Sequence, residues 1–191
     1  MVLIGLMAIK ESGKSTAADY LVNKYGFIER PLALCLKLAL KEIFLLSDDQ
    51  LFGSQTIKET PDPRWKNCTP RTMFQYIGTD LFREQLNNIM PGINNDVFIE
   101  HFKLWYGEHL KLYPDSCVVI SDVRFQNEVD YIQSVGGYVI KIDRQEITNS
   151  DKHESESGIQ KIISCDFFIN NDGTDNYYKL LSKIIEPLIG V

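Results

Sequence analysis

The sequence predicts a three-layer α/β sandwich, in which a five-stranded parallel sheet carries helices on both faces. An apolar run at 1–8, MVLIGLMA, leads directly into a Ser-Gly-Lys-Ser-Thr turn and then into a helical pattern. Further short apolar runs alternate with helix-like segments along the chain, which is typical of parallel strands joined by helical crossovers. Charged residues directly follow two of these runs, at 122–124 and 143–144. Such positions lie at the carboxyl edge of a parallel sheet, where ligands bind.

The first strand, the turn and the first helix form the pattern of a phosphate-binding loop (P-loop). Such a loop wraps backbone N–H groups around a polyphosphate, while Lys14 neutralises the β and γ oxygens and Ser15 reaches Mg²⁺. One residue departs from the pattern, because Ala8 stands where a glycine is expected. Alanine fits there if its φ is negative and its Cβ points away from the phosphates. The residues expected to bind ATP are Ile9, Lys10, Glu11, Ser12, Gly13, Lys14, Ser15 and Thr16.

The first half of the chain continues with alternating helices and one strand. Gly26 is expected to end the first helix, and Thr69 with Pro70 is expected to begin a later one. The Ser47–Gln50 segment has the shape of a capping box. The expected elements are a helix at 16–25, a strand at 27–29, a helix at 31–46, a polar loop at 54–69, and helices at 70–86 and 94–111.

The second half repeats the order of strand and helix. A fully apolar run at 116–121 predicts a buried strand, and Asp122, Val123 and Arg124 follow it. Asp122 is expected to hold Mg²⁺ or its waters; its alternative role is as N-cap of the next helix. The remaining elements are a helix at 125–134, a strand at 138–142, a strand at 166–170 and a helix at 174–189.

Two connections leave the carboxyl side of the predicted sheet and suggest the domain layout. We expect one domain over 1–191, with an acceptor-binding insertion at about 37–112 and a mobile lid at about 144–164. Gly78, in the middle of a helical pattern, predicts close approach by another backbone or a ligand. The insertion carries the candidate cations Lys37, Lys58, Arg64, Arg71 and Arg83.

This layout predicts phosphoryl transfer from ATP to a phosphorylated small molecule. Several cations must converge when two phosphates meet, and arginine forks suit this task. The acceptor oxygen is already ionised near pH 7, so catalysis needs positioning and charge stabilisation rather than a strong base. A closing lid would exclude the water that competes for the phosphoryl group.

Composition excludes several other classes of function. The net charge of −6 argues against a nucleic-acid partner, and no apolar run approaches the ~20 residues of a membrane span. We therefore expect a soluble cytoplasmic protein without nucleic-acid or membrane partners. The four cysteines lack metal-ligand spacing, so buried thiols in a reducing compartment are expected.

Several segments together resemble the deoxynucleoside monophosphate kinases of tailed phages and large DNA viruses, which are relatives of the P-loop nucleoside monophosphate kinases. The specific ones are TPRTMFQYIGTD at 69–80 and DVRFQNEVDYI at 122–132. Others occur in the same order, and the matches extend over most of the chain from Met1 to Gly173. They are LKLALKEIFLLSDDQLFG at 36–53, HESE at 153–156 and DFFINNDG at 166–173. The segment 90–97 has no clear counterpart in that family.

The resemblance implies an ATP-dependent, Mg²⁺-requiring kinase with acceptor-binding helices and a lid, active in nucleotide metabolism. Its catalytic residues would be Lys14, Asp122, Arg124 and Arg144, with Ser15 and Asp122 at the metal. Its lid segment would carry Arg144, His153, Ser155 and Glu156. The layout permits a homodimer, and a viral source would place the protein in the host cytoplasm. The residues expected to bind the acceptor are Lys37, Arg64, Arg71, Phe74, Gln75 and Arg83.

Two alternatives stay open at this point. Animal-type phosphomevalonate kinases resemble the chain at SDVR, at HESE and at the DFFINN strand, and they perform the same chemistry on another acceptor. Phe74, Tyr76 and Trp105 favour a nucleobase acceptor, because a base needs a flat apolar surface. The second alternative is a nucleotide-binding protein that transfers no phosphate.

Overall fold

The computed structural model of the chain describes residues 1–9, 11–93, 96–144 and 164–191. The chain divides into two units. The first, here called the sheet unit, comprises Met1–Leu32 and Phe102–Val191, and the second, the helical unit, comprises Ala33–His101. The helical unit overlaps most of the expected insertion at 37–112.

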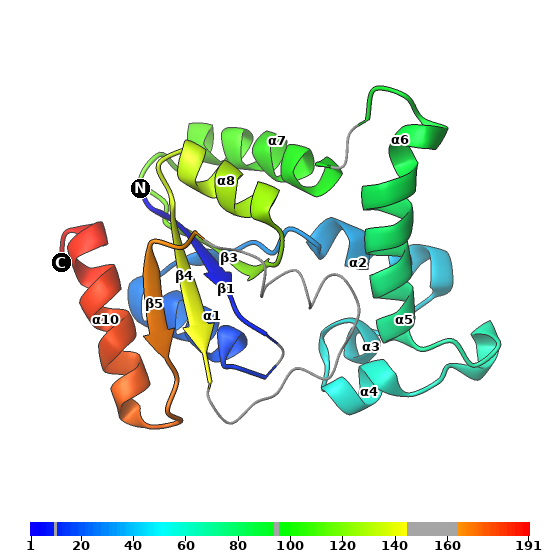
Figure 1. The fold of residues 1–191 in the computed structure, drawn as a ribbon, viewed down its shortest axis with the longest axis horizontal. Helices are drawn as coiled ribbons and strands as arrows, with labels where there is room; N and C mark the ends of the chain where they lie inside the picture. The colour runs from blue at the N-terminus through cyan, green and yellow to red at the C-terminus, as the bar shows by residue number, and fades with distance from the viewer. Residues whose placement is uncertain (10, 94–95, 145–163) are drawn as a thin grey trace. The chain divides into compact units, whose positions relative to one another are not determined.

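The sheet unit is built on a five-stranded sheet with the order β2-β3-β1-β4-β5 (Figure 1). Every neighbouring pair of strands is parallel, as predicted. The central strand β1 is buried along its whole length, which is typical of parallel strands with helices on both sides. The strands are β1 Leu3–Met7, β2 Ile28–Glu29, β3 Val118–Val123, β4 Tyr138–Asp143 and β5 Phe167–Asn170.

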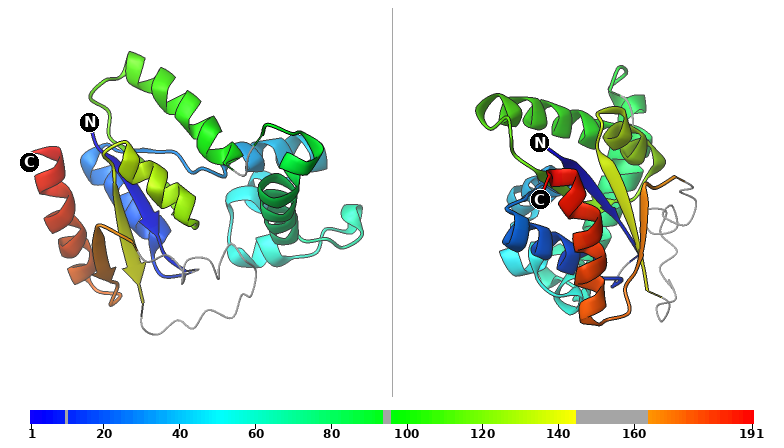
Figure 2. Two further views of the ribbon diagram at one scale, coloured as in Figure 1. Left: turned by 45° about the horizontal axis from the view of Figure 1, so that its top comes forward. Right: turned by 90° about the vertical axis from the view of Figure 1, so that its left-hand side faces the viewer.

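Side-chain alternation along β1 explains how both faces of the sheet are covered. Ile4 and Leu6 point into a buried cluster with α1 (Lys14–Tyr25) and α10 (Asp175–Ile189). The position between them, Gly5, faces Ile132 of α8 (Gln126–Ser134) instead, because successive residues of a strand point to opposite faces. Figure 2 shows α1 and α10 on one side of the strands and α8 on the other.

Several predicted boundaries shift by one or two residues. Helix α1 begins at Lys14 rather than residue 16, and Gly26 ends it with a left-handed backbone, as predicted. Strand β3 continues through Asp122 and Val123, because its pairing register with β1 shifts at this end and keeps the chain extended. The predicted helix at 94–111 is α7, Val97–Leu112, which crosses from one unit into the other.

The helical unit contains short helices connected by capped turns. The Ser47 capping box with Gln50 and the Thr69 N-cap are both confirmed. The polar loop expected at 54–69 is partly wrong, because it contains α4 and the 3-10 turn η1; Ser54 and Asp62 cap them with their side chains. The predicted helix at 70–86 continues through α5, the π-helical segment η2 and α6. The elements are α2 Leu34–Phe44, α3 Asp48–Phe52, α4 Gln55–Glu59, η1 Pro63–Trp65, α5 Pro70–Gln75, η2 Tyr76–Gln85 and α6 Leu86–Ile89.

Gly78 is a position of close approach, as the sequence indicated. A Cβ built there would lie 2.7 Å from Cδ2 of Leu36 on α2. The neighbour is therefore a leucine side chain, and not the backbone or ligand that was expected. The glycine lets α2 and η2 pack closely within the helical unit.

The cysteines and the membrane prediction give two further outcomes. All four cysteines are thiols outside any disulfide bond, but they are half-buried rather than buried as expected. In the described parts of the chain, every helix falls short of the length and apolar character needed to cross a membrane.

The crowded backbone around Gly137 leads to a stability prediction. A Cβ at Gly137 would lie 2.9 Å from the carbonyl oxygens of both Leu3 and Ile132. We expect Gly137→Ala to lower the free energy of unfolding by about 1–3 kcal/mol, because rigid backbone would have to move. Gly107→Ala, in open space on α7, should raise it by about 0.5–1 kcal/mol through helix propensity. Urea denaturation measures both, and equal effects of the two variants would contradict the packing argument.

Candidate active site

The loop between β1 and α1 has the course of a phosphate-binding loop. Strand β1 ends at Met7, helix α1 begins at Lys14, and residues 8–13 connect them. Gly13 has φ 102°, a conformation that side chains rarely adopt. A Cβ at this position would also collide with Nδ2 of Asn171. Gly13 is therefore required by its backbone conformation and by its surroundings.

Ala8 fits the loop as the sequence analysis required. Its side chain is buried, and it is not among the residues with positive φ. The left-handed position falls instead on Glu11, with φ 67°. A non-glycine residue there stores strain of roughly 1 kcal/mol. The departure from the motif at Ala8 therefore adds no backbone strain at that position, and the strain lies three residues later.

Two polar side chains of the loop have notable surroundings. The Lys14 ammonium donates a hydrogen bond back to the carbonyl of Ala8, which keeps its charge within the loop. Ser12 is buried, and its hydroxyl has no hydrogen-bond partner among the described residues. A buried hydroxyl without a partner is costly, and a bound phosphate oxygen would satisfy it. Of the predicted ATP-binding residues, Lys10 lies outside the described part of the chain.

Asp122 and Arg124 are placed by the end of β3. The Asp122 carboxylate accepts a hydrogen bond of 2.7 Å from the backbone N–H of Leu32, which fixes its orientation beside β2. It does not cap α8, because that helix begins after Phe125.

The buried Glu128 fixes the turn that carries Arg124. Its Oε2 accepts hydrogen bonds from the backbone N–H groups of Arg124 (2.7 Å) and Phe125 (3.1 Å). Sequence reasoning missed this carboxylate. The available signal was an acidic residue in the first turn of a predicted helix.

Arg144 lies at the same edge of the sheet, immediately after β4. Its Nη2 is 3.7 Å from the position that a Cβ on Gly173 would occupy. The guanidinium thus reaches the turn between β5 and α10. Because β3, β1, β4 and β5 are parallel neighbours, their carboxyl ends bring the loop, Asp122, Arg124 and Arg144 to one edge. The predicted lid residues His153, Ser155 and Glu156 lie outside the described residues.

The helical unit contains a cluster of three cations. The pKa of Lys58 is lowered by burial and, in addition, by the positive charges of Lys37 and Arg71. The Lys37 ammonium also lies 5.0 Å from the centre of the Phe52 ring. Like charges held this close destabilise one another unless an anion joins them. These three residues are therefore the candidate cations for a phosphate in the helical unit.

Arg64 and Arg83, two other predicted acceptor residues, have partners within the helical unit. Arg64 forms an ion pair of 2.6 Å with Asp62, whose side chain is buried, and the hydrogen bonds of this pair, with one from Gln50, hold the pKa of Asp62 well below its usual range. Arg83 lies 4.8 Å from the centre of the Phe98 ring. Arg64 thus has a structural role in holding the 62–68 turn, whereas its contact with a substrate stays a prediction.

Two of the aromatic residues that favour a nucleobase acceptor, Phe74 and Trp105, fall in different units. Phe74 is half-buried on α5, beside Gln75, in the helical unit. Trp105 belongs to the sheet unit. The His109 ring stacks on it with 4.9 Å between ring centres, and the Arg30 guanidinium lies 4.7 Å from the centre of the Trp105 ring. These contacts give Trp105 a packing role.

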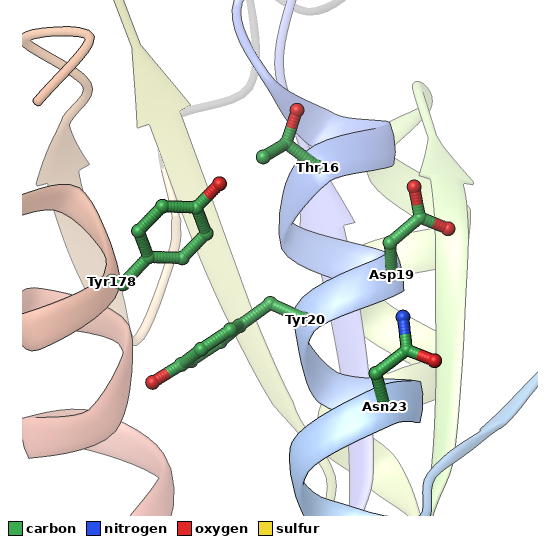
Figure 3. A pocket seen from close by; sticks show the side chains of 5 residues that line it. All are labelled: Thr16, Asp19, Tyr20, Asn23 and Tyr178. Carbon is green, nitrogen blue, oxygen red and sulfur yellow. The ribbon is translucent and has the colours of Figure 1, made fainter. Parts of the chain in front are cut away.

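A surface hollow of about 420 Å³ lies beside α1 (Figure 3). The rings of Tyr20 and Tyr178, which both line the hollow, pack together with 4.9 Å between their centres. Sequence reasoning did not indicate it. Its lining residues are Thr16, Asp19, Tyr20, Asn23 and Tyr178.

The residues expected at the metal fit Mg²⁺ in type and number. Magnesium in kinases is bound by one or two carboxylates or hydroxyls, by substrate phosphates and by water. Ser15 and Asp122 offer one hydroxyl and one carboxylate at the phosphate-loop edge of the sheet unit. Within the described ranges there is no cluster of three or more His, Cys, Asp or Glu side chains that could hold a metal ion.

Comparisons with known proteins identify the family of the chain and a viral relative. A family model described as deoxynucleotide monophosphate kinase matches residues 50–184. An Acanthamoeba polyphaga mimivirus protein, named provisionally as a deoxynucleotide monophosphate kinase, is 53% identical over 187 residues, covering 97% of each chain. Among solved structures, shikimate kinase from Aquifex aeolicus aligns with a TM-score of 0.43 and 13% identity, over 99% of this chain and 97% of that one.

The Asp62–Arg64 pair leads to a prediction about stability and pH. Because the folded protein lowers the pKa of Asp62, the pair stabilises the fold above the unfolded pKa of about 4. This contribution is lost as the pH falls below that value. We expect Asp62→Asn to lower the urea midpoint at pH 7, with the difference from wild type shrinking below pH 4.

A matched control is Asp48→Asn, which removes an exposed ion pair with Lys41. Its effect should stay within about 0.5 kcal/mol. A difference between Asp62→Asn and wild type that is constant from pH 7 to pH 3 would contradict the assigned role of the carboxylate.

Proposed function

Because the chain belongs to the deoxynucleotide monophosphate kinase family, we propose that it transfers the γ-phosphoryl group of ATP to a deoxynucleoside monophosphate. The chain is thus a nucleotide kinase, a phosphotransferase that uses ATP. The products would be ADP and the deoxynucleoside diphosphate. The structural observation that carries the proposal is the strand–loop–helix at 3–25, with a left-handed Gly13 and the Lys14 ammonium held inside the loop.

On the donor side, the loop would bind the ATP phosphates through backbone N–H groups and Lys14. The first N–H groups of α1 have no partner within the helix and carry its positive dipole end. The buried Ser12 hydroxyl is a further donor. Ser15 and Asp122 would hold Mg²⁺, which when bound neutralises charge on the phosphate oxygens.

On the acceptor side, we propose that Lys37, Lys58 and Arg71 bind the monophosphate. Burial lowers the pKa of Lys58, and the positive charges of Lys37 and Arg71 lower it further, so the three cations are near enough to act on one anion. Gln75 and Phe74 follow Arg71 on α5 and would contact the nucleobase, one by hydrogen bonds and one by its ring. Arg83, beside Phe98, and Arg64 remain secondary candidates.

The chemistry requires charge stabilisation rather than proton removal. An oxygen of the acceptor phosphate, already ionised near pH 7, attacks the γ phosphorus, and the bond to the β–γ bridging oxygen breaks, leaving ADP. Arg124 and Arg144 would stabilise the negative charge on the transferring group, because guanidinium forks match phosphate oxygens. Proton transfer therefore requires no side chain of this chain.

The cell compartment and the assembly are further proposals. The viral relative and four cysteines that form no disulfide bond support the cytoplasm of an infected cell as the place of action. A homodimer is also compatible with the resemblance to viral deoxynucleoside monophosphate kinases.

The first test is turnover with separate acceptors. A coupled assay would offer dTMP, dGMP, dCMP, dAMP and phosphomevalonate, each with ATP and Mg²⁺. We expect ADP formation with at least one deoxynucleotide and none with phosphomevalonate. Turnover with phosphomevalonate alone would replace the proposed acceptor, and binding of ATP without any turnover would indicate a non-catalytic nucleotide-binding protein.

Lys14→Ala tests the loop. We expect kcat to fall about 10²- to 10³-fold, because a charged group aimed at the transferring phosphate is lost. Lys179→Ala, at an exposed lysine of α10, is the matched control and should leave kcat unchanged. Equal rates for Lys14→Ala and wild type would exclude the loop from catalysis.

Arg71→Ala tests the acceptor site. We expect KM for the monophosphate to rise about 10-fold or more, while KM for ATP changes less than twofold, because a charge-assisted hydrogen bond to phosphate contributes about 1.5–3 kcal/mol. Lys66→Gln, at an exposed lysine of the same unit, serves as control. A rise in KM for ATP instead would assign Arg71 to the donor.

A further inference from the structure

The phosphate loop is held from outside by two residues to which the sequence analysis gave no role. Asn171, directly after β5, donates through Nδ2 to the carbonyl oxygen of Ser12 at 2.9 Å. Tyr177, in the first turn of α10, donates through its hydroxyl to the carbonyl oxygen of Gly13 at 3.0 Å. Asn171 and Tyr177 therefore hold two consecutive peptide groups of the loop.

Holding these carbonyls fixes the direction of the N–H groups that bind anions. In a trans peptide the N–H points opposite to the C=O of the same plane. The carbonyl of Ser12 shares its plane with the N–H of Gly13, and the carbonyl of Gly13 with that of Lys14. Both N–H groups are therefore directed away from Asn171 and Tyr177.

The two holding residues are themselves immobilised. Asn171 is 6% exposed, its backbone N–H donates to the carbonyl of Asp143 at 2.7 Å, and its Oδ1 accepts from the N–H of Gly173 at 3.0 Å. The side-chain amide of Asn171 is thus held at both its nitrogen and its oxygen. Tyr177 is 2% exposed and packs in the cluster under α1, and burial raises the pKa of Tyr177, so its hydroxyl keeps the proton it donates.

Helix α10 is also fastened to α1 farther along its length. The hydroxyl of Ser182 lies 2.8 Å from that of Tyr20 and 2.9 Å from that of Tyr25. Tyr25 also donates to Glu186 at 2.9 Å. The loop leads into α1, and α10 is anchored to that same helix. Tyr177 therefore keeps a constant position relative to Gly13.

The contacts also explain why residue 13 is glycine. Nδ2 of Asn171 occupies the space of a Cβ at position 13, and the Tyr177 hydroxyl is 3.5 Å from it. The carbonyl of Gly13 accepts a second bond, of 3.0 Å, from the N–H of Ala17, so both of its lone pairs are used. The left-handed glycine and the two donors therefore depend on one another.

We propose that Asn171 and Tyr177 are positioning residues that set the Gly13 and Lys14 N–H groups in their phosphate-binding orientation before ATP arrives. The inference rests on the proposed function, because ATP is the anion that the loop would receive. Donors fixed in advance need no reorganisation when the phosphates bind or when charge develops during transfer. Loss of the two side-chain contacts should therefore weaken binding of the donor nucleotide and leave binding of the acceptor unchanged.

The test compares Tyr177→Phe and Asn171→Asp with wild type. We expect Tyr177→Phe to raise the Kd of ADP, measured calorimetrically, and the KM of ATP by about 3- to 10-fold, as for one neutral hydrogen bond. Asn171→Asp should raise both more than 10-fold, because a carboxylate would face the Ser12 carbonyl. The KM of the monophosphate should stay within twofold. The matched control is Tyr178→Phe, which removes the hydroxyl of the neighbouring ring that faces Tyr20. This variant should bind ADP as wild type does.

A merely structural role predicts another pattern. If Tyr177→Phe lowers Tm while the Kd of ADP and the KM of ATP stay within twofold of wild type, the proposal is wrong. Wild-type protein supplies a measurement that needs no variant to fold: the Gly13 and Lys14 amide order parameters should be about 0.85 without nucleotide and unchanged with ADP. Values below 0.6 that rise on ADP addition would overturn the proposal.

These outcomes separate the positioning role from the proposed function. Absence of turnover with every acceptor, together with weakened ADP binding in the two variants, would remove the function and keep the positioning role. Normal turnover of a deoxynucleotide, with unchanged ADP binding in both variants, would keep the proposed function and remove the positioning role.

Discussion

The parallel pairing of β3, β1, β4 and β5 is the constraint on which the sheet unit depends. It places four carboxyl ends at one edge, so a short motif after each strand reaches the same region without any long-range sequence signal. For this reason the loop after β1, Asp122 in β3, Arg144 after β4 and Asn171 after β5 lie at one edge, and they are the positions proposed to act on the donor nucleotide. The apolar runs that form the strands therefore determine the location of the chemistry as well as the stability of the core.

Much of this arrangement could be predicted, because periodicity and capping residues are local signals. The five strands, the Gly26 helix end and the Thr69 cap follow from neighbouring residues and are confirmed. The helix within 54–69 was missed because charged and proline-rich composition conceals a five-residue helix. The Asn171 and Tyr177 contacts were missed because they join positions about 160 residues apart, and a single sequence carries no signal for such pairs.

The helical unit illustrates another limit of sequence reasoning. Five cations could be named from composition, but their partners could not. The structure separates Arg64, which is paired with a buried aspartate, from Lys58, whose pKa is lowered by burial and then by two neighbouring positive charges. The first arrangement stabilises a turn, whereas the second is the one that we propose for binding the acceptor phosphate. Burial and charge neighbours, rather than residue type, thus separate a cation with a structural partner from the cations proposed to bind phosphate.

Glu11 has a consequence for the history of the gene. Its left-handed backbone suits glycine, asparagine and aspartate and resists valine. Single base changes in a glutamate codon lead to glycine, aspartate, alanine, valine, lysine and glutamine. Of these replacements, glycine and aspartate fit the backbone best, whereas a change to valine would be removed by selection on folding. The sequences of related viral genes should differ at this position in that restricted way, even where the rest of the loop is the same.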